Sequence, residues 1–371
     1  MFSSSTSPHY GRARYMKILA IETSCDDTCI SIIKIKGQRS KIKSFEVLSN
    51  VVSSQVKLHA KYGGVYPFLA KREHQRNLPL VLKKALKEAG NPKINLIAVT
   101  VGPGLEPCLW TGINLARGLA EKMKLPIIPV NHIEAHIVAN FIGEKSKVLF
   151  PAICLVVSGG HTQLILMKKL GQYKILGETR DDAAGECFDK VARILELGYP
   201  GGPKIATEAA KLPIANFQFP IKLPRPMIYQ KNYDFSFSGL KTAVLYDFKK
   251  RSPKTRKSKQ YIQKMCAEIQ QAIIDVLIHK TLKTAKDYKA KSIILAGGVA
   301  ANKELRKQFE GKIKREIPYS KFYIPDSKFC TDNAAMVAVA GYFNRKGKGN
   351  WKKIKANANL RIDQKYGSET C

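Results

Sequence analysis

The sequence predicts an α/β protein built as two related lobes around a cleft. Short runs rich in β-branched residues alternate with segments of helical periodicity, which is the pattern of strands alternating with helices. A pair of glycines follows a buried strand at two separate places, Gly159-Gly160 and Gly297-Gly298. With 371 residues, the chain also exceeds the size at which one hydrophobic core usually divides into two.

Four strands are the clearest elements, and each leads into a turn of small or polar residues. They cover residues 17–22, 96–101, 152–157 and 292–296, and the turns after them read ETSCDDT, GPGL, SGGHT and GGVAAN. Ligands of α/β proteins bind at the carboxyl ends of such strands. We therefore expect the functional residues to lie in these turns.

The chain divides into four expected segments. The first is either a disordered tail or a start assigned too early, since Met16 stands directly before a strand; its serine-rich, acid-free composition also resembles a transit peptide. Two α/β lobes follow, and then a C-terminal helix that packs back toward the first lobe, with a basic tail. In order, the four segments are residues 1–15, 16–149, 150–332 and 333–371.

The two Gly pairs predict anion-binding turns at equivalent places in duplicated lobes. Glycine lets the backbone approach a phosphate, and exposed N–H groups in such a turn can hold the anion. A single Gly pair is more often only a tight turn. Because the chain has neither a G-x-x-x-x-G-K-[ST] loop nor a G-x-G-x-x-G motif, two such turns favour a two-lobed cleft over a Walker or Rossmann nucleotide site.

The segment NHIEAH, residues 131–136, carries the most specific chemistry. Asn131 is placed to cap a helix, and on that helix His132 and His136 lie on one face at a spacing that suits a shared metal ion. Two ordinary histidines near a helix start are the alternative, at about even odds. A zincin peptidase is disfavoured, because it needs the glutamate directly after the first histidine and Glu134 stands one residue later.

A third ligand is expected to be an acid in a loop at the end of another strand. Asp332 stands just before the apolar helix expected at residues 334–343, and taken alone it would more often be the N-cap of that helix. Together with the two histidines it completes a two-histidine, one-carboxylate set. That set leaves open coordination positions and suits iron(II) or zinc(II).

The charge balance points to a polyanionic partner. The chain has 63 basic and 29 acidic residues, a formal charge of +34, although a lysine bias can also come from an A/T-rich genome. Two basic runs, residues 249–259 (a loop) and 344–355, predict a track for nucleic-acid phosphates, although such runs are usually solvated surface.

The apolar stretches are too short to cross a bilayer. The eight cysteines form no C-x-x-C pair and are expected to be reduced.

Eight motifs run in order from Ile18 to about Met336: ILAIETSCDDT, NHIEAH, VSGGHTQL, DDAAGECFDKVA, GYPGGP, FSFSGLKTA, AGGVAAN and TDNAAM. Together they resemble the TsaD family, the tRNA N6-adenosine threonylcarbamoyltransferases, and most closely its bacterial and mitochondrial branch. The resemblance covers nearly the whole chain. It implies an actin/hexokinase/Hsp70-like fold, in which two related α/β lobes surround a central cleft.

The resemblance also implies roles for particular residues. One divalent metal ion per chain, iron(II) favoured and zinc(II) the alternative, would be held by His132, His136 and Asp332. Substrate contacts are implied for Val156, Val157, Ser158, Gly159, Gly160, Asp189, Gly202 and Asn302. Gly202 could instead only shape a turn, and Asp189 could cap a helix or pair with Lys190 or Arg193. Ala206 stands where many family members have a substrate-contacting aspartate, so that contact is not expected.

The implied activity moves a threonylcarbamoyl group from L-threonylcarbamoyladenylate to the N6 amine of the adenosine 3′ to the anticodon, in tRNAs reading codons that begin with A, and releases AMP. The implied partners are tRNA, this adenylate and, in a bacterium, a TsaB-like paralogue and a TsaE-like ATPase, with no membrane. The expected location is the cytoplasm, with the mitochondrial matrix as the lesser alternative. An ATP-dependent phosphotransferase or ATPase of the same fold is the second hypothesis, and a metallopeptidase is the third.

Overall fold

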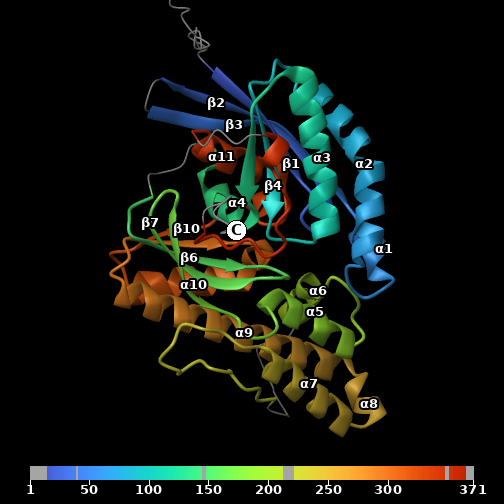
Figure 1. Cartoon of the computed structure of the whole chain (residues 1–371). Coiled ribbons are helices and arrows are strands. Elements are labelled where there is room, and N and C mark those ends of the chain that lie inside the picture. The colour runs from blue at the N-terminus through green and yellow to red at the C-terminus, as the bar shows by residue number, and fades with distance from the viewer. Residues whose placement is uncertain (1–14, 39–40, 144–147, 212–220, 347–350, 365–371) are drawn as a thin grey trace, which may run out of the picture.

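Two five-stranded mixed sheets form the frame of the molecule (Figure 1). The computed structural model describes residues 15–38, 41–143, 148–211, 221–346 and 351–364. The strand order is β3-β2-β1-β4-β5 in the first sheet and β10-β9-β6-β7-β8 in the second. Read from the opposite edge, the second sheet repeats the order of the first: two strands joined by antiparallel pairing lie on one side of the central strand, and two joined by parallel pairing lie on the other.

The first sheet is built around β1, which is buried on both faces at its carboxyl end. Its strands are β1 (Tyr15–Glu22), β2 (Asp27–Gln38), β3 (Lys41–Ser54), β4 (Leu96–Gly102) and β5 (Ile127–Asn131). Three helices accompany it, namely α1 (Val56–Ala60), α2 (Pro67–Glu88) and α3 (Glu106–Met123). The strands expected at residues 17–22 and 96–101 are confirmed as parts of β1 and β4.

The second sheet is built around β6, which is buried along its whole length. Its strands are β6 (Ala152–Val157), β7 (Thr162–Lys169), β8 (Gln172–Glu178), β9 (Ser292–Ala296) and β10 (Lys321–Tyr323). Its helices are α5 (Ala184–Ile194), α6 (Gly201–Ala210), α7 (Ser238–Lys250), α8 (Pro253–Arg256), α9 (Lys259–Asp287) and α10 (Lys303–Glu316). The strands expected at 152–157 and 292–296 are confirmed as β6 and β9.

The Gly pairs do not occupy equivalent places in two lobes, so this prediction was wrong. Both pairs end strands of the second sheet, because β6 and β9 are parallel neighbours. Gly297 has a φ of 90°, and a side chain there would overlap the carbonyl of Val157. The lobes are related by strand order instead, which makes the turn after β1 the topological equivalent of the turn after β6.

One helix packs against both sheets at the site, and a second helix packs against the first sheet. On α4 (His132–Val138), Ala135 packs into the core of the first sheet, whereas Ile133 and Ile137 pack into the core of the second. The helix α11 (Ala334–Asn344) lies across the first sheet with Gly341 so close that an added Cβ would be 2.5 Å from the Cβ of Ala98. The starts of α4 and α11, which lie at the site, are thus held in place by the packing of these two helices.

Some sequence expectations fall outside the described residues. The expected tail, residues 1–15, lies outside them except for Tyr15, which belongs to β1. The division of the chain into four segments stays a prediction. The seven cysteines in the described ranges are free thiols. Among the described helices, none combines the length and the apolar character that a membrane crossing requires.

The basic segment 249–259 is not a plain loop. It contains the end of α7, the short helix α8 and the first residue of α9. Ser252 and Ser258 cap these helices, since their hydroxyl oxygens accept hydrogen bonds from the backbone N–H groups of Thr255 and Tyr261. The sequence prediction missed the two caps because lysine-rich composition masked them.

Candidate metal centre

The two histidines of NHIEAH lie together at the start of α4. The side chain of Asn131 caps this helix, because its Oδ1 accepts hydrogen bonds from the N–H groups of Ile133 at 2.9 Å and Glu134 at 3.1 Å. The cap predicted from the sequence is therefore confirmed. His132 and His136 are both buried, and their ring centroids are 4.6 Å apart.

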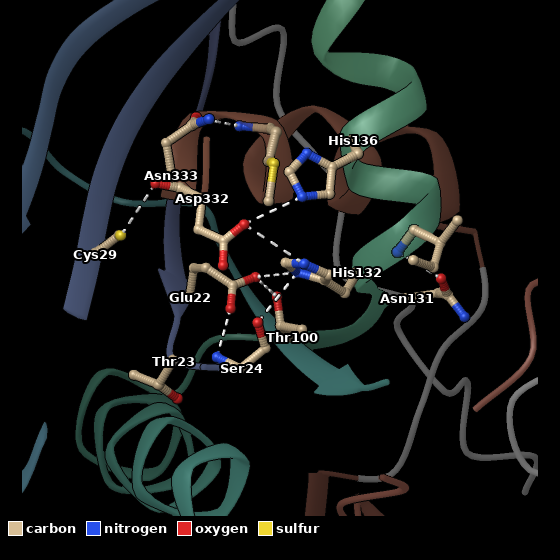
Figure 2. Close-up of polar contacts among 12 residues, drawn as sticks. Glu22, Thr23, Ser24, Cys29, Thr100, Asn131, His132, His136, Asp332 and Asn333 are labelled. Atoms are coloured by element: carbon tan, nitrogen blue, oxygen red, sulfur yellow. Dashed lines mark hydrogen bonds and ion pairs between the residues drawn. The ribbon is translucent and has the colours of Figure 1, made fainter. Parts of the chain in front are cut away.

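Asp332 meets both histidines from the segment before α11 (Figure 2). Its Oδ1 lies 3.1 Å from Nε2 of His136 and 3.5 Å from Nε2 of His132. The ligand atoms of these three residues all lie within 4.8 Å of one another. Two imidazoles and one carboxylate aimed at a common point are the donors that iron(II) and zinc(II) take in proteins, so the residues fit a metal ion.

Asp332 is not the N-cap of α11, so the simpler interpretation of this residue was wrong. The cap is Asn333, whose Oδ1 accepts a hydrogen bond from the N–H of Met336 at 3.1 Å. The neighbouring asparagine satisfies the helix end, and the carboxylate of Asp332 is left to face the histidines.

A buried glutamate contacts Nδ1 of His132, the ring nitrogen farther from Asp332. Oε2 of Glu22 lies 3.0 Å from Nδ1 of His132, and Oγ of Ser24 lies 3.2 Å from the same nitrogen. Glu22 also accepts hydrogen bonds from the hydroxyl of Thr100 at 2.6 Å and the N–H of Ser24 at 2.5 Å. A carboxylate on the far nitrogen of a ligand histidine fixes its tautomer and ring orientation. Sequence reasoning missed Glu22, although an acid ending a buried strand was a usable signal.

The electrostatics of the site favour positive charge between the carboxylates. Burial lowers the pKa of His132, but the charges of Glu22 and Asp332 outweigh burial and raise the pKa to about 9. Burial raises the pKa of Asp332, but the charge of His132 and the hydrogen bond from His136 bring it well below its usual range. In the described part of the chain, Nδ1 of His136 is buried and has no hydrogen-bond partner. Both carboxylates are thus held ionised beside the imidazoles.

Glu134 does not serve the metal centre. Its Oε1 accepts a hydrogen bond from the hydroxyl of Tyr173 at 3.1 Å, and its Oε2 accepts one from Nδ2 of Asn344 at 2.7 Å. These contacts tie α4 to the second sheet and to the end of α11. The general base that a zincin peptidase places beside its metal is therefore not supplied by this glutamate.

The turn after β6 comes close to the two histidines, because α4 packs against β6 through Ile133 and Ile137. His161, in this turn, has its pKa lowered to about 4 by burial and by the charges of His132 and His136. The side chains of Val156 and Val157 are buried in the cores, so only their backbone can meet a ligand. The turn residues Ser158, Gly159 and Gly160 are at least partly exposed, and an added Cβ on either glycine would meet no atom within 4 Å.

The other predicted substrate residues have structural partners of their own. Asp189 on α5 accepts a hydrogen bond from the N–H of Gly201 at 2.6 Å, so it caps α6, as the alternative interpretation expected. Gly202 lies in the first turn of α6. Asn302 caps α10 through the N–H of Leu305 at 2.9 Å and donates to Oε1 of Gln270 at 2.8 Å. A substrate role for these residues remains a prediction.

Comparison with known sequences identifies one family. The family model described as TsaD, tRNA N6-adenosine threonylcarbamoyltransferase, matches residues 46–339. The tRNA N6-adenosine threonylcarbamoyltransferase of Thermosipho africanus (strain TCF52B) is 46% identical over 350 residues, which cover 94% of this chain and 100% of that protein. The enzyme of the same name from Geobacillus kaustophilus (strain HTA426) is 46% identical over 327 residues, covering 87% and 90% of the two chains.

Comparison with solved structures supports the fold. Full-length HypF in its phosphate- and nucleotide-bound form has a TM-score of 0.53 and 12% identity, covering 91% of this chain and 47% of that one. HypF from T. kodakarensis has a TM-score of 0.58 and 12% identity, covering 92% and 49%. This chain thus spans about half of each HypF chain. At such low identity the likeness concerns the fold alone, which is the expected actin/hexokinase-like α/β fold.

Proposed function

The chain belongs to the TsaD family, the tRNA N6-adenosine threonylcarbamoyltransferases, and on this premise we propose how its site performs the transfer. The threonylcarbamoyl group of L-threonylcarbamoyladenylate moves to the N6 amine of the adenosine 3′ to the anticodon, in tRNAs reading codons that begin with A. The observation that carries this proposal is the convergence of His132, His136 and Asp332 beside the exposed Gly turn.

In the proposed site, His132, His136 and Asp332 hold one divalent metal ion. Iron(II) is favoured by the two-histidine, one-carboxylate donor set, and zinc(II) is the alternative. When bound, the metal supplies Lewis-acid polarisation of an oxygen of the donor. Glu22 keeps the proton of His132 on Nδ1, so that Nε2 offers its lone pair.

We assign the adenylate to the turns around β6 and α6. The open space beside Gly159 and Gly160 lets the phosphate approach their backbone, and we assign the ribose hydroxyls to the carboxylate of Asp189. Gly202 and Asn302 are assigned to the polar edge of the adenine base, for which the amide of Asn302 would give up its contacts with Gln270 or Leu305. In the transfer, N6 bonds to the carbamoyl carbon, the bond from that carbon to the phosphate oxygen breaks, AMP leaves and N6 loses a proton. The residues position the donor against the amine, which is the main task because the anhydride is already activated.

Mass analysis of tRNA nucleosides tests the proposed function directly. tRNA is incubated with the adenylate donor, with and without this protein, and we expect threonylcarbamoyladenosine only when the protein is present. Unmodified tRNA together with ATP turnover in the absence of tRNA would instead indicate an ATPase of the same fold. Adding a TsaB-like paralogue and a TsaE-like ATPase to parallel reactions tests whether these proposed partners are needed.

We propose the cytoplasm as the location of the protein, with the mitochondrial matrix as the alternative.

Gly159→Val tests the assignment of the adenylate phosphate to the turn after β6. The added side chain meets no protein atom at its Cβ, so it should leave the fold intact and occupy space that the phosphate needs. We expect weaker donor binding by calorimetry and unchanged tRNA affinity. Gly311→Val on α10 is the matched control, because its Cβ would also meet no atom within 4 Å. Parent-like donor affinity in Gly159→Val would contradict the assignment.

The basic segment 249–259 is proposed to follow tRNA phosphates. Arg251 already forms an ion pair with Asp247 and Arg256 lies over the ring of Phe248, so the test replaces the lysines with glutamine: Lys249, Lys250, Lys254, Lys257 and Lys259. We expect weaker tRNA binding and a flatter dependence of log affinity on log salt, by about one unit of slope per lost contact. Glutamine at Lys122 and Lys124 near the end of α3 is the control. An unchanged slope in the segment variant would leave this run as solvated surface.

A further inference from the structure

Three aromatic side chains are exposed where α1 meets α2. Tyr62, Tyr66 and Phe68 have 63%, 55% and 73% of their surface in contact with solvent. The rings of Tyr62 and Tyr66 are stacked, with centroids 6.1 Å apart and planes 28° from parallel. A group of large exposed aromatic residues in one short stretch usually marks an interaction surface. We refer to these three residues as the aromatic platform.

The surroundings of the aromatic platform are positively charged. Lys57, Lys61, Lys71 and Arg72 are exposed on the same stretch of α1 and α2. Across the described ranges, none of these four has an acidic group within ion-pair distance, and the nearby Glu73 pairs with Arg76. Aromatic rings interleaved with unpaired cations are the composition of a single-stranded nucleic-acid surface, since bases stack on the rings and phosphates meet the cations.

The aromatic platform is also connected to the proposed substrate site. The N–H of Tyr66 donates to Nδ1 of the buried His59 at 3.3 Å. Arg193 on α5, four residues after Asp189, donates a hydrogen bond to the carbonyl of Gly63 between the two tyrosines. The segment thus bridges the first sheet's helices to the helix that carries Asp189, and Figure 1 shows α1 close to α5 and α6.

We propose that the aromatic platform stacks unpaired bases of the tRNA anticodon loop next to the adenosine that is modified, while the four cations hold the adjoining phosphates. The inference rests on the proposed function and deepens it by assigning a surface to the RNA. An adenosine presented to the triad must leave its stack, so its neighbours lose a stacking partner. The exposed faces of Tyr62 and Tyr66 replace that partner, and stacking needs the rings but not their hydroxyls.

The test compares two double variants with the parent protein. Tyr62→Ala with Tyr66→Ala removes the rings, whereas Tyr62→Phe with Tyr66→Phe keeps them. The probe is an anticodon stem-loop RNA that carries 2-aminopurine beside the target adenosine. The fluorescence of 2-aminopurine is quenched when this base stacks. We expect the alanine pair to weaken RNA binding at least roughly tenfold and to abolish the quench, and the phenylalanine pair to keep both. Tyr319→Ala, at another exposed tyrosine on the loop before β10, is the control and should bind like the parent.

Two results would overturn the proposal. The first is parent-like affinity and quench in the alanine pair. The second is parent-like RNA binding together with a changed oligomeric state in sedimentation, which would make the aromatic platform a protein interface instead. Donor binding and thermal unfolding of each variant report whether the fold is intact, and the single variant Tyr62→Ala replaces the pair if the pair unfolds. RNA binding is measured without turnover, so a failure of the parent to modify tRNA would count against the proposed function and not against this surface.

Discussion

Asp332→Asn is expected to remove the metal and abolish transfer while leaving the fold nearly unchanged. Asparagine has the size of aspartate but offers no anion, so the site keeps two neutral donors and loses its charged one. The loss should exceed the roughly 10- to 100-fold that removal of a supporting hydrogen-bond partner costs. Metal content by elemental analysis and modified nucleoside by mass analysis are the two measurements.

The fold should tolerate this change because Asp332 caps no helix. Asn333 caps α11, so the helix start keeps its hydrogen bond to Met336. The matched control is Asp326→Asn, since Asp326 is exposed and caps a short 3-10 helix through the N–H of Lys328, a role that asparagine performs equally well. A variant at Asp332 that retained no metal and still modified tRNA at the parent rate would show that the triad is not the reaction's metal site.

What the sequence predicted well is local. The helix period alone puts His132 and His136 on one face, and Asn131 next to them is a cap that needs only its own neighbours. Buried strands were predictable for the same reason, since each is an uninterrupted apolar run that ends in a turn.

What the sequence did not predict depends on contacts between distant segments. Glu22 and His132 are 110 residues apart in the chain, and nothing near either residue reveals that their side chains meet. Likewise, only the parallel pairing of β6 with β9 brings Gly297 against Val157, so two similar turns were assigned to different lobes when they share one sheet. The choice of cap between Asp332 and Asn333 depends on the backbone, because Asn333 has the extended φ of −157° and ψ of 152° of an N-cap.

Glu22→Gln is expected to weaken metal binding by roughly 10- to 100-fold without touching a ligand. The carboxylate of Glu22 accepts hydrogen bonds from Ser24, Thr100 and the imidazole of His132. A glutamine has one accepting oxygen and one donating NH2 group. If the oxygen stays with the N–H of Ser24, the NH2 group takes the place of Oε2 and faces both the hydroxyl of Thr100 and Nδ1 of His132, which must then accept. The proton of His132 moves to Nε2, and the lone pair that the metal needs is lost.

The measurement is a calorimetric titration of the metal-free protein with iron(II) or zinc(II), followed by transfer assays at rising metal concentration. Excess metal should restore much of the transfer in Glu22→Gln, because all three ligands remain and only their affinity has fallen. Glu134→Gln is the matched control: it makes the same change at a buried glutamate on α4 whose partners, Tyr173 and Asn344, are not ligands. Equal metal affinity in Glu22→Gln and Glu134→Gln would show that Glu22 supports the fold of this region but does not set the tautomer of His132.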